Sequence, residues 1–306
     1  MIDLNSRTYL ILFLFFTPLI VFNQVNSTYT LKILGVVQDG GLPHLGSDRI
    51  CCEDFEQNRY VTSIMLINNE TNESYLFDAS PDINKQLNFM GKGIKKNLKG
   101  IFLTHAHIGH YTGLMYFGRE ALNSKLMKVY AMPRMKKFLE QNGPWSQLVS
   151  LENISITELN NKSNIVIDSN VTVQPIEVPH RAEFSETVGY KIYGPNKTAL
   201  FIPDIDKWYL WEKSIVDEIE NIDYVLIDAT FYDSKEVNYR DLSEIPHPFV
   251  VESIELFDSM KYEERNKIFF IHLNHTNPLL DKESDQYKFV KEKGYNVAEE
   301  GLNLKL

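Results

Sequence analysis

The chain has 306 residues and a formal net charge of −10 at neutral pH. This length and an ordinary apolar content allow one or two domains with a sizeable core. The acidic balance argues against nucleic acid as a partner, since nucleic-acid-binding proteins carry basic faces. We find no repeat, heptad run or linker rich in proline or serine, which favours a single compact domain over 28–306.

The first 27 residues differ from the rest. Arg7 precedes an apolar stretch over Tyr9–Phe22, and polar residues follow at Asn23–Ser27. The stretch is shorter than the roughly 20 residues of a membrane-spanning helix, but it suits the core of a signal peptide. We therefore expect 1–27 to be a signal peptide or an N-terminal anchor, and the protein to be exported, as a periplasmic or secreted protein. Contact with a membrane would come only from an uncleaved leader.

Short apolar runs at 31–37, 62–68 and 75–79 predict strands, and 82–90 predicts a helix. The loop after the first run contains Gly40 and Gly41, which permit a tight turn. It also carries His44 and the only two cysteines, Cys51 and Cys52. Adjacent cysteines rarely bridge each other, so either these thiols are free or they join His44 in a structural zinc site.

Three of the eight histidines lie within six residues, directly after the apolar run Ile101–Leu103. They are His105, His107 and His110. A buried strand followed by a loop lets alternate side chains converge, and converging imidazoles are typical of a zinc-type site. Helices are predicted next, at 111–122 and 133–140.

The rest of the chain is rich in short strands. Strands are predicted at 154–159, 165–167, 171–178, 188–194, 198–203, 223–231 and 267–274, and helices at 207–220, 249–260 and 284–293. Strands with helices in two separated groups predict an α+β fold, a four-layer αββα sandwich with helices outside two packed sheets.

Three ligand-type residues stand where predicted strands end. His180 ends the run VQPIEVPH, Asp204 ends ALFIPD, and His272 ends KIFFIH. The sheet holds the backbone at such positions and the loop opens to solvent. Each residue alone could be a cap or a histidine satisfied by a carbonyl. Together with the triplet, however, they form an ordered set of ligands.

This ordered set resembles the HxHxDH signature and later ligands of the metallo-β-lactamase superfamily. The resemblance implies His105, His107 and His180 as ligands of a first metal, and His110 and His272 as ligands of a second. It implies Asp204 as the carboxylate that bridges the two metals and orients the reacting water. It also implies Asp78 as an orienter of a histidine.

One position departs from the signature. Gly109 stands where the superfamily has an aspartate ligand, and a glycine offers no ligand atom. Affinity for the second metal should therefore fall unless a water or another residue substitutes. His275 and Asp82 are the candidate substitutes. The first metal keeps three histidines and Asp204, enough for one zinc with an open position for water.

Other segments resemble particular branches of the superfamily. FFIHLNHTNP (269–278) and LGVVQDGG resemble motifs of the pyrroloquinoline quinone biosynthesis protein B family. IDATFYD (227–233) and IPHPF (245–249) resemble those of tRNase Z-type phosphodiesterases. The latter implies that Asp228 orients His247, which protonates a leaving oxygen; alternatively, His247 only packs before a helix.

We therefore expect a metal-dependent hydrolase that uses a metal-activated water on a small-molecule substrate, a phosphodiester or related ester. Zinc is the expected metal, with iron or manganese as alternatives. Two other functions stay open. One is an iron-dependent hydroxylase like the pyrroloquinoline quinone biosynthesis protein B family, and the other is a non-catalytic binding protein on the same fold.

Overall fold

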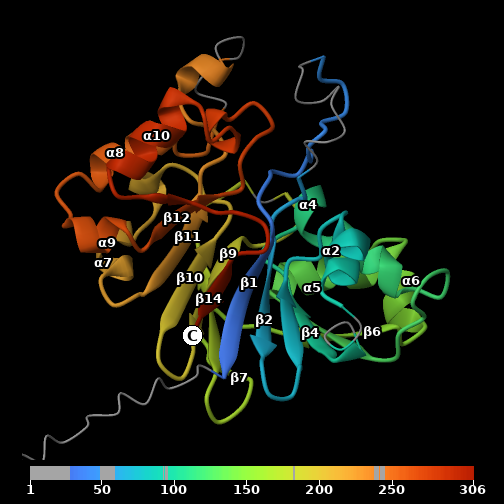
Figure 1. The fold of residues 1–306 in the computed structure, drawn as a ribbon. Helices are drawn as coiled ribbons and strands as arrows, with labels where there is room; N and C mark the ends of the chain where they lie inside the picture. The colour runs from blue at the N-terminus through green and yellow to red at the C-terminus, as the bar shows by residue number, and fades with distance from the viewer. Residues whose placement is uncertain are drawn as a thin grey trace, which may run out of the picture.

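The computed structural model describes residues 28–48, 59–91, 93, 96–181, 183–237, 241 and 245–306. The predicted leader, Cys51 and Cys52 lie outside the described residues. Within the described part, no helix is long and apolar enough to span a membrane. Two seven-stranded sheets pack face to face with helices on both outer faces (Figure 1), which confirms the predicted four-layer αββα sandwich.

The first sheet has the strand order β14-β1-β2-β3-β4-β5-β6. It comprises β1 (Tyr29–Gly35), β2 (Ser63–Asn68), β3 (Ser74–Phe77), β4 (Leu98–Phe102), β5 (Met127–Ala131), β6 (Ile154–Glu158) and β14 (Asn303–Lys305). The strands from β3 to β6 are parallel, whereas β1 pairs antiparallel with both β2 and β14.

The second sheet has the strand order β13-β12-β11-β10-β9-β8-β7. It comprises β7 (Ile165–Val166), β8 (Thr172–Glu177), β9 (Val188–Tyr193), β10 (Thr198–Ile202), β11 (Tyr224–Asp228), β12 (Ile268–Ile271) and β13 (Asn296–Val297). The strands from β10 to β13 are parallel, and the others pair antiparallel.

The helices divide between the two outer faces (Figure 1). The first sheet is covered by α2 (Ile83–Phe89), α4 (Ile108–Tyr111), α5 (Pro133–Gln141) and α6 (Trp145–Ser150). The second is covered by α7 (Ile215–Ile219), α8 (Val250–Leu256), α9 (Tyr262–Arg265) and α10 (Asp285–Glu292). Short 3₁₀ turns are η2 (Thr112–Phe117), η3 (Trp208–Leu210), η4 (Ser234–Val237) and η6 (Pro278–Leu280).

Three apolar layers hold the sandwich together, one between the sheets and one under each set of helices. Alternation along β4 shows how one strand serves two of them, because Ile101 faces the helices and Phe102 faces the other sheet. The Phe102 ring stacks on Tyr130, with centroids 4.2 Å apart, and meets Tyr190 of the second sheet edge-on at 5.5 Å. This packing fixes the two sheets against each other.

Two predicted helices are shorter than expected. The segment 111–122 forms only the end of α4 and then η2, because the Gly113 N–H donates to the Ala79 carbonyl at 2.9 Å and not to a carbonyl within the helix. The segment 207–220 is broken between η3 and α7, where the Trp211 indole is buried and donates to the Glu177 carbonyl. Strands β5, β13 and β14 and helices α6 and α9 were not predicted.

Candidate metal centre

The clustered histidines lie where β4 gives way to α4. His105 and His107 are in the connecting loop, and His110 is in α4. Pairing continues one residue beyond β4, because the Leu103 N–H donates to the Tyr130 carbonyl. The parallel strands of both sheets end at the same edge of the sandwich, so the loops that carry the other candidate residues meet here.

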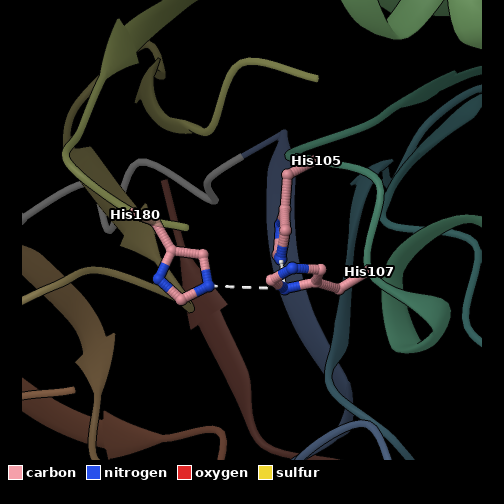
Figure 2. A group of neighbouring side chains, drawn as sticks. All are labelled: His105, His107 and His180. Carbon is pink, nitrogen blue, oxygen red and sulfur yellow. Dashed lines mark hydrogen bonds between the residues drawn. The ribbon is translucent and has the colours of Figure 1, made fainter. Parts of the chain in front are cut away.

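His105, His107 and His180 form a first cluster, here called the histidine group (Figure 2). The Nδ1 of His107 lies 2.9 Å from His105 Nε2 and 3.3 Å from His180 Nε2. Ligand atoms of a tetrahedral zinc, each about 2.0–2.1 Å from the ion, lie about 3.3 Å from one another. Both distances from His107 Nδ1 are therefore close to the spacing of ligand atoms around a tetrahedral zinc, and all three nitrogens lie within 4.8 Å of one another.

Asp39, His110, Asp204 and His272 form a second cluster, here called the carboxylate group. His110 Nε2 lies 3.1 Å from Asp39 Oδ1 and 2.9 Å from Asp204 Oδ2. His272 Nε2 lies 3.7 Å and 3.2 Å from the same two oxygens. All four ligand atoms are buried and make no hydrogen bond of acceptable geometry. Four orphaned polar atoms that face one another fit a cation, because burial without a partner is costly.

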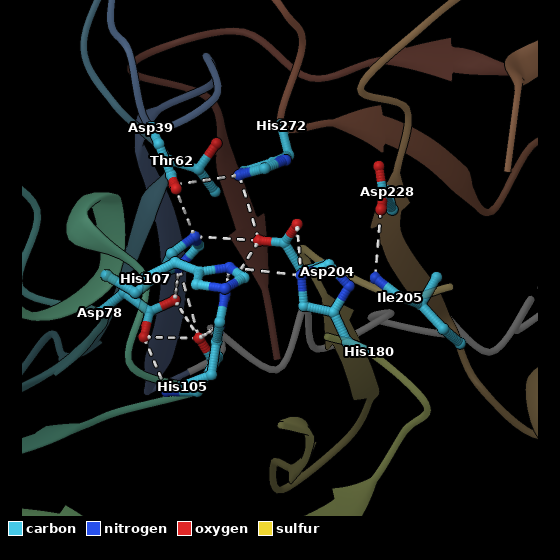
Figure 3. Close-up of polar contacts among 12 residues, drawn as sticks. Asp39, Thr62, Asp78, His105, His107, His180, Asp204, Ile205, Asp228 and His272 are labelled. Atoms are coloured by element: carbon cyan, nitrogen blue, oxygen red, sulfur yellow. Dashed lines mark hydrogen bonds and ion pairs between the residues drawn. The ribbon is translucent and has the colours of Figure 1, made fainter. Parts of the chain in front are cut away.

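Asp204 faces both groups (Figure 3). It follows β10, and its side chain is 3% exposed. Besides its contacts in the carboxylate group, its Oδ2 lies 3.6 Å from His105 Nε2 and its Oδ1 lies 3.7 Å from His180 Nε2. A carboxylate in this position can contact two cations at once.

The ring nitrogens that face away from the cluster are held by oxygen atoms. His110 Nδ1 lies 2.7 Å from Asp78 Oδ2, and His180 Nδ1 lies 2.9 Å from Asp206 Oδ1. His272 Nδ1 lies 3.0 Å from the hydroxyl of Thr230. Partners of this kind fix the ring and the tautomer of a metal-binding histidine, which leaves the other nitrogen to bind the metal.

Two of these side chains depend on an unusual backbone conformation. Asp78 follows β3 and has a φ of 65°, and His272 follows β12 and has a φ of 66°. Residues other than glycine seldom adopt this left-handed region, although Asp and His do so more readily than most. Such backbone strain concentrates at functional sites.

The buried carboxylates and imidazoles of the cluster shift one another's pKa values strongly. Burial alone would raise the pKa of Asp204, but the surrounding imidazoles of His272, His110 and His105 hold it well below its usual range. Burial would lower the pKa of His110, but Asp78, Asp204 and Asp39 raise it well above its usual range. The buried carboxylates thus hold a proton on His110 where no metal supplies the positive charge.

His247 and Asp228 form a pair beside the cluster. His247 Nδ1 lies 2.7 Å from Asp228 Oδ2 and 3.6 Å from Asp204 Oδ1. Asp228 is fully buried and also accepts hydrogen bonds from the Thr230 hydroxyl and the Ile205 N–H. Burial opposes protonation of His247, but the Asp228 carboxylate raises its pKa to about 9. The imidazole is therefore protonated at neutral pH.

Every candidate ligand from the sequence lies in one of these groups: His105, His107, His180, Asp204, His110 and His272. The two candidate substitutes for the missing aspartate lie elsewhere among the described residues. Asp82 accepts a hydrogen bond from the Val61 N–H, and His275 stacks on His44. The second carboxylate that faces His110 and His272, besides Asp204, belongs to Asp39, which was not predicted from the sequence. Its one signal is its place beside two glycines at the end of the first strand.

Comparison with known proteins identifies the family. The model of the beta-lactamase superfamily domain matches residues 73–273. Together with the αββα sandwich, this match shows that the chain belongs to the metallo-β-lactamase superfamily.

Particular relatives match along nearly the whole described chain. Coenzyme PQQ synthesis protein B of Methylococcus capsulatus is 24% identical over 90% of this chain and 99% of that protein. The same-named protein of Gluconobacter oxydans is 25% identical over 90% of this chain and 97% of that protein. Among solved structures, Zn²⁺-bound PqqB from Methylobacterium extorquens has a TM-score of 0.76 at 21% identity, over 90% of this chain and all of that one. A diphosphatase of the PhnP family has a TM-score of 0.64 at 19% identity, over 90% of this chain and 96% of that one.

Proposed function

We propose that this protein is a metal-dependent hydrolase that holds divalent cations, zinc foremost, in the histidine and carboxylate groups. The observation that carries the proposal is the position of Asp204, whose carboxylate faces both groups. The two groups together offer five imidazoles and two carboxylates, a nitrogen-rich donor set that suits zinc better than magnesium or calcium. The solved relative with bound zinc also supports this choice of metal.

The residues of the site divide the work of hydrolysis among them. Divalent cations held by the histidine and carboxylate groups would supply a Lewis acid and a water whose pKa is lowered toward neutrality. Asp204, which faces both groups, would help to hold the cations and would orient that water toward the substrate. Asp78, Asp206 and Thr230 hold the histidines in place, so little reorganisation is needed during the reaction.

A phosphodiester is the substrate class that best explains the His247–Asp228 pair. Asp228 holds Nδ1 of His247, which leaves Nε2 to donate a proton to the leaving oxygen. The raised pKa keeps this proton in place at neutral pH. A poor leaving group such as an alkoxide needs a proton donor of this kind. The fold similarity to a diphosphatase of the PhnP family agrees with phosphoryl chemistry.

Metal content and activity together test the proposal. The purified protein should contain zinc by mass spectrometry and hydrolyse nitrophenyl phosphodiesters faster than phosphate monoesters or lactones. His107→Ala should remove zinc from the histidine group and abolish activity. The matched control is His275→Ala, which changes a histidine outside both groups and should keep the metal. A wild-type protein that binds no metal would contradict the proposal.

The role of His247 has a separate test. His247→Gln should slow esters with poor leaving groups by roughly 10²- to 10⁴-fold, the usual contribution of a general acid. Activated nitrophenyl esters should be affected much less, because their leaving groups need no proton. An equal loss on both kinds of substrate would remove His247 as the proton donor.

A second candidate is a role in coenzyme PQQ synthesis, as the names of the curated relatives state for those proteins. The match over 90% of this chain favours it. In this case the metal would be iron, and turnover would require oxygen and leave the phosphodiesters untouched. A metal-loaded protein without turnover on any substrate would instead indicate a binding protein.

Export remains part of the proposal. Arg7 and the apolar stretch after it support an exported protein, and the net charge of −10 argues against nucleic acid as a partner. N-terminal sequencing of the native protein should find a chain that begins near residue 28, or an intact leader in the membrane fraction. An intact chain in the soluble cell fraction would contradict export.

A further inference from the structure

Gly109 and Asp39 share one small volume, although 70 positions separate them in the sequence. A Cβ placed on Gly109 would lie 2.2 Å from Asp39 Oδ1 and 2.9 Å from both the Cα and the Cγ of Asp39. Real Cβ atoms essentially never make contacts under 3.0 Å. The Asp39 carboxylate therefore occupies the space that any side chain at position 109 would need.

The backbone delivers Asp39 to this position. Val37 forms a parallel bridge with Leu273, the residue after His272. The Gln38 N–H donates to the Leu273 carbonyl at 2.9 Å, and the Leu273 N–H donates to the Val36 carbonyl at 2.8 Å. Asp39 and His272 are thus held by the same pair of segments, one from each sheet. This placement is a property of the fold and does not depend on a chance rotamer.

The carboxylate itself is set up as a ligand. The side chain of Asp39 is 17% exposed, and its Oδ1 is buried and makes no hydrogen bond of acceptable geometry. This oxygen faces the Nε2 atoms of His110 and His272, the same atoms that face Asp204. Two carboxylate oxygens and two imidazole nitrogens are donor types that zinc binds.

We propose that Asp39 is the second carboxylate ligand of a cation in the carboxylate group, and that Gly109 is required because it leaves room for this carboxylate. The aspartate that the family signature places at position 109 is thereby replaced, through space, from another loop. The site would then hold one cation in each group, and Asp204 faces both positions. This inference rests on the metal binding in the proposed function.

Substitutions at positions 39 and 109 test the assignment by metal stoichiometry and affinity, measured by mass spectrometry and calorimetry with zinc. Asp39→Asn keeps the shape and removes the charge. It should keep the zinc of the histidine group and weaken the other zinc more than the roughly 10- to 100-fold expected for loss of an outer partner. Gly109→Ala should weaken the same zinc, because the new methyl group displaces the Asp39 carboxylate. Gly93→Ala is the control, because a Cβ there meets nothing within 4 Å.

The exchange variant Asp39→Gly with Gly109→Asp moves the carboxylate back to the position in the signature and should restore binding of the second zinc. Gly109→Asp alone should weaken binding of the second zinc, because the Asp39 carboxylate still fills the space that the new side chain needs. Melting temperatures of each variant without metal show whether it is folded. Two zinc ions with unchanged affinity in folded Asp39→Asn would overturn the assignment, as would a wild-type protein with only one. A wild-type protein without zinc would instead overturn the proposed function.

Discussion

The outward-facing nitrogens of the histidines show how strongly single residues control this site. The Nδ1 of His180 contacts the Asp206 carboxylate, and its Nε2 faces the other nitrogens of the histidine group. The Asp206 N–H also donates to the Pro179 carbonyl at 2.7 Å, so the backbone keeps this carboxylate beside the imidazole. Loss of the carboxylate should loosen the ring without removing a ligand.

Asp206→Ala should therefore weaken zinc binding in the histidine group by roughly 10- to 100-fold, as is usual for an outer partner of a metal-binding histidine. Competition with a chromogenic chelator measures the change. Glu140→Ala, which removes an exposed carboxylate on α5, is the control and should have the affinity of the wild type. An unchanged affinity in Asp206→Ala would show that His180 needs no orientation.

The candidate ligands from the sequence are gathered in the structure because each follows a predicted strand, and those strands end at one edge of the sandwich. Asp39 could not be found in the same way. It stands in a glycine-rich loop, four residues after β1 ends, and its link to Gly109 exists only in space. A short motif records which residues are near in sequence and gives no sign of a substitute from elsewhere.

Among the secondary-structure elements, strand β9 is bonded to the segment just before the loop of His105 and His107. The Tyr190 hydroxyl on β9 donates to the carbonyl of Leu103, two residues before His105, and so joins the second sheet to the end of β4. Both groups are buried, since Tyr190 is 0% exposed and Leu103 is 1% exposed.

Tyr190→Phe should leave the Leu103 carbonyl without its partner and lower the free energy of unfolding by about 1–3 kcal/mol. Urea denaturation of the metal-free protein measures the loss. Tyr193→Phe on the same strand is the matched control, because its hydroxyl makes only a 3.4 Å contact with Gln174 in a half-buried position. Equal stabilities of the two variants would contradict a special role for the Tyr190 hydroxyl.

Buried strands were the elements most readily predicted, because hydrophobic runs such as YVLID and IFFI belong to strands covered on both faces. The edge strands β13 and β14 have only two and three residues, too few for a periodic pattern. The predicted helices at 111–122 and 207–220 were wrong in extent, because tertiary packing at Gly113 and Trp211 outweighed local preference.

At the scale of the whole molecule, the metal centre joins the two sheets. His105 and His110 follow β4 of the first sheet, whereas Asp204 and His272 follow β10 and β12 of the second. A ligand that binds only the folded protein stabilises it by mass action. The cations should therefore stabilise the sandwich as well as carry the chemistry.

Free zinc at about 100 times its dissociation constant should stabilise the protein by about 2.7 kcal/mol and raise its melting temperature. Differential scanning calorimetry of metal-free and zinc-loaded protein measures the shift. Magnesium at the same concentration is the control, since it prefers oxygen ligands in octahedral geometry. Equal melting temperatures with and without zinc would contradict a metal site that links the sheets.

Glu300 adds a dependence of global stability on pH, away from the metal centre. Burial raises the pKa of its carboxyl from 4.5 to about 7, although the N–H of Tyr60 and the charge of Arg59 oppose the rise and Asp82 adds to it. The folded protein thus binds more protons than the unfolded chain between these values, so stability falls as pH rises through that window.

Glu300→Gln should remove this decrease of stability with rising pH. The free energy of unfolding of the wild type, relative to the variant, should fall by on the order of 2 kcal/mol between pH 4.5 and 7. Urea denaturation across this range measures it, and Glu299→Gln controls for loss of one negative charge at an exposed neighbour. A constant difference between wild type and Glu300→Gln would show that the carboxyl titrates alike in both states.

The shared volume of Gly109 and Asp39 also restricts how this site can change over generations. An aspartate gained at 109 meets the carboxylate of Asp39, and a glycine gained at 39 removes one of the four ligands of the cation in the carboxylate group. Either first step costs the second cation, and only both together regain it. A lineage with this arrangement is therefore held in it by epistasis: the two residues must be inherited, lost or exchanged as a pair.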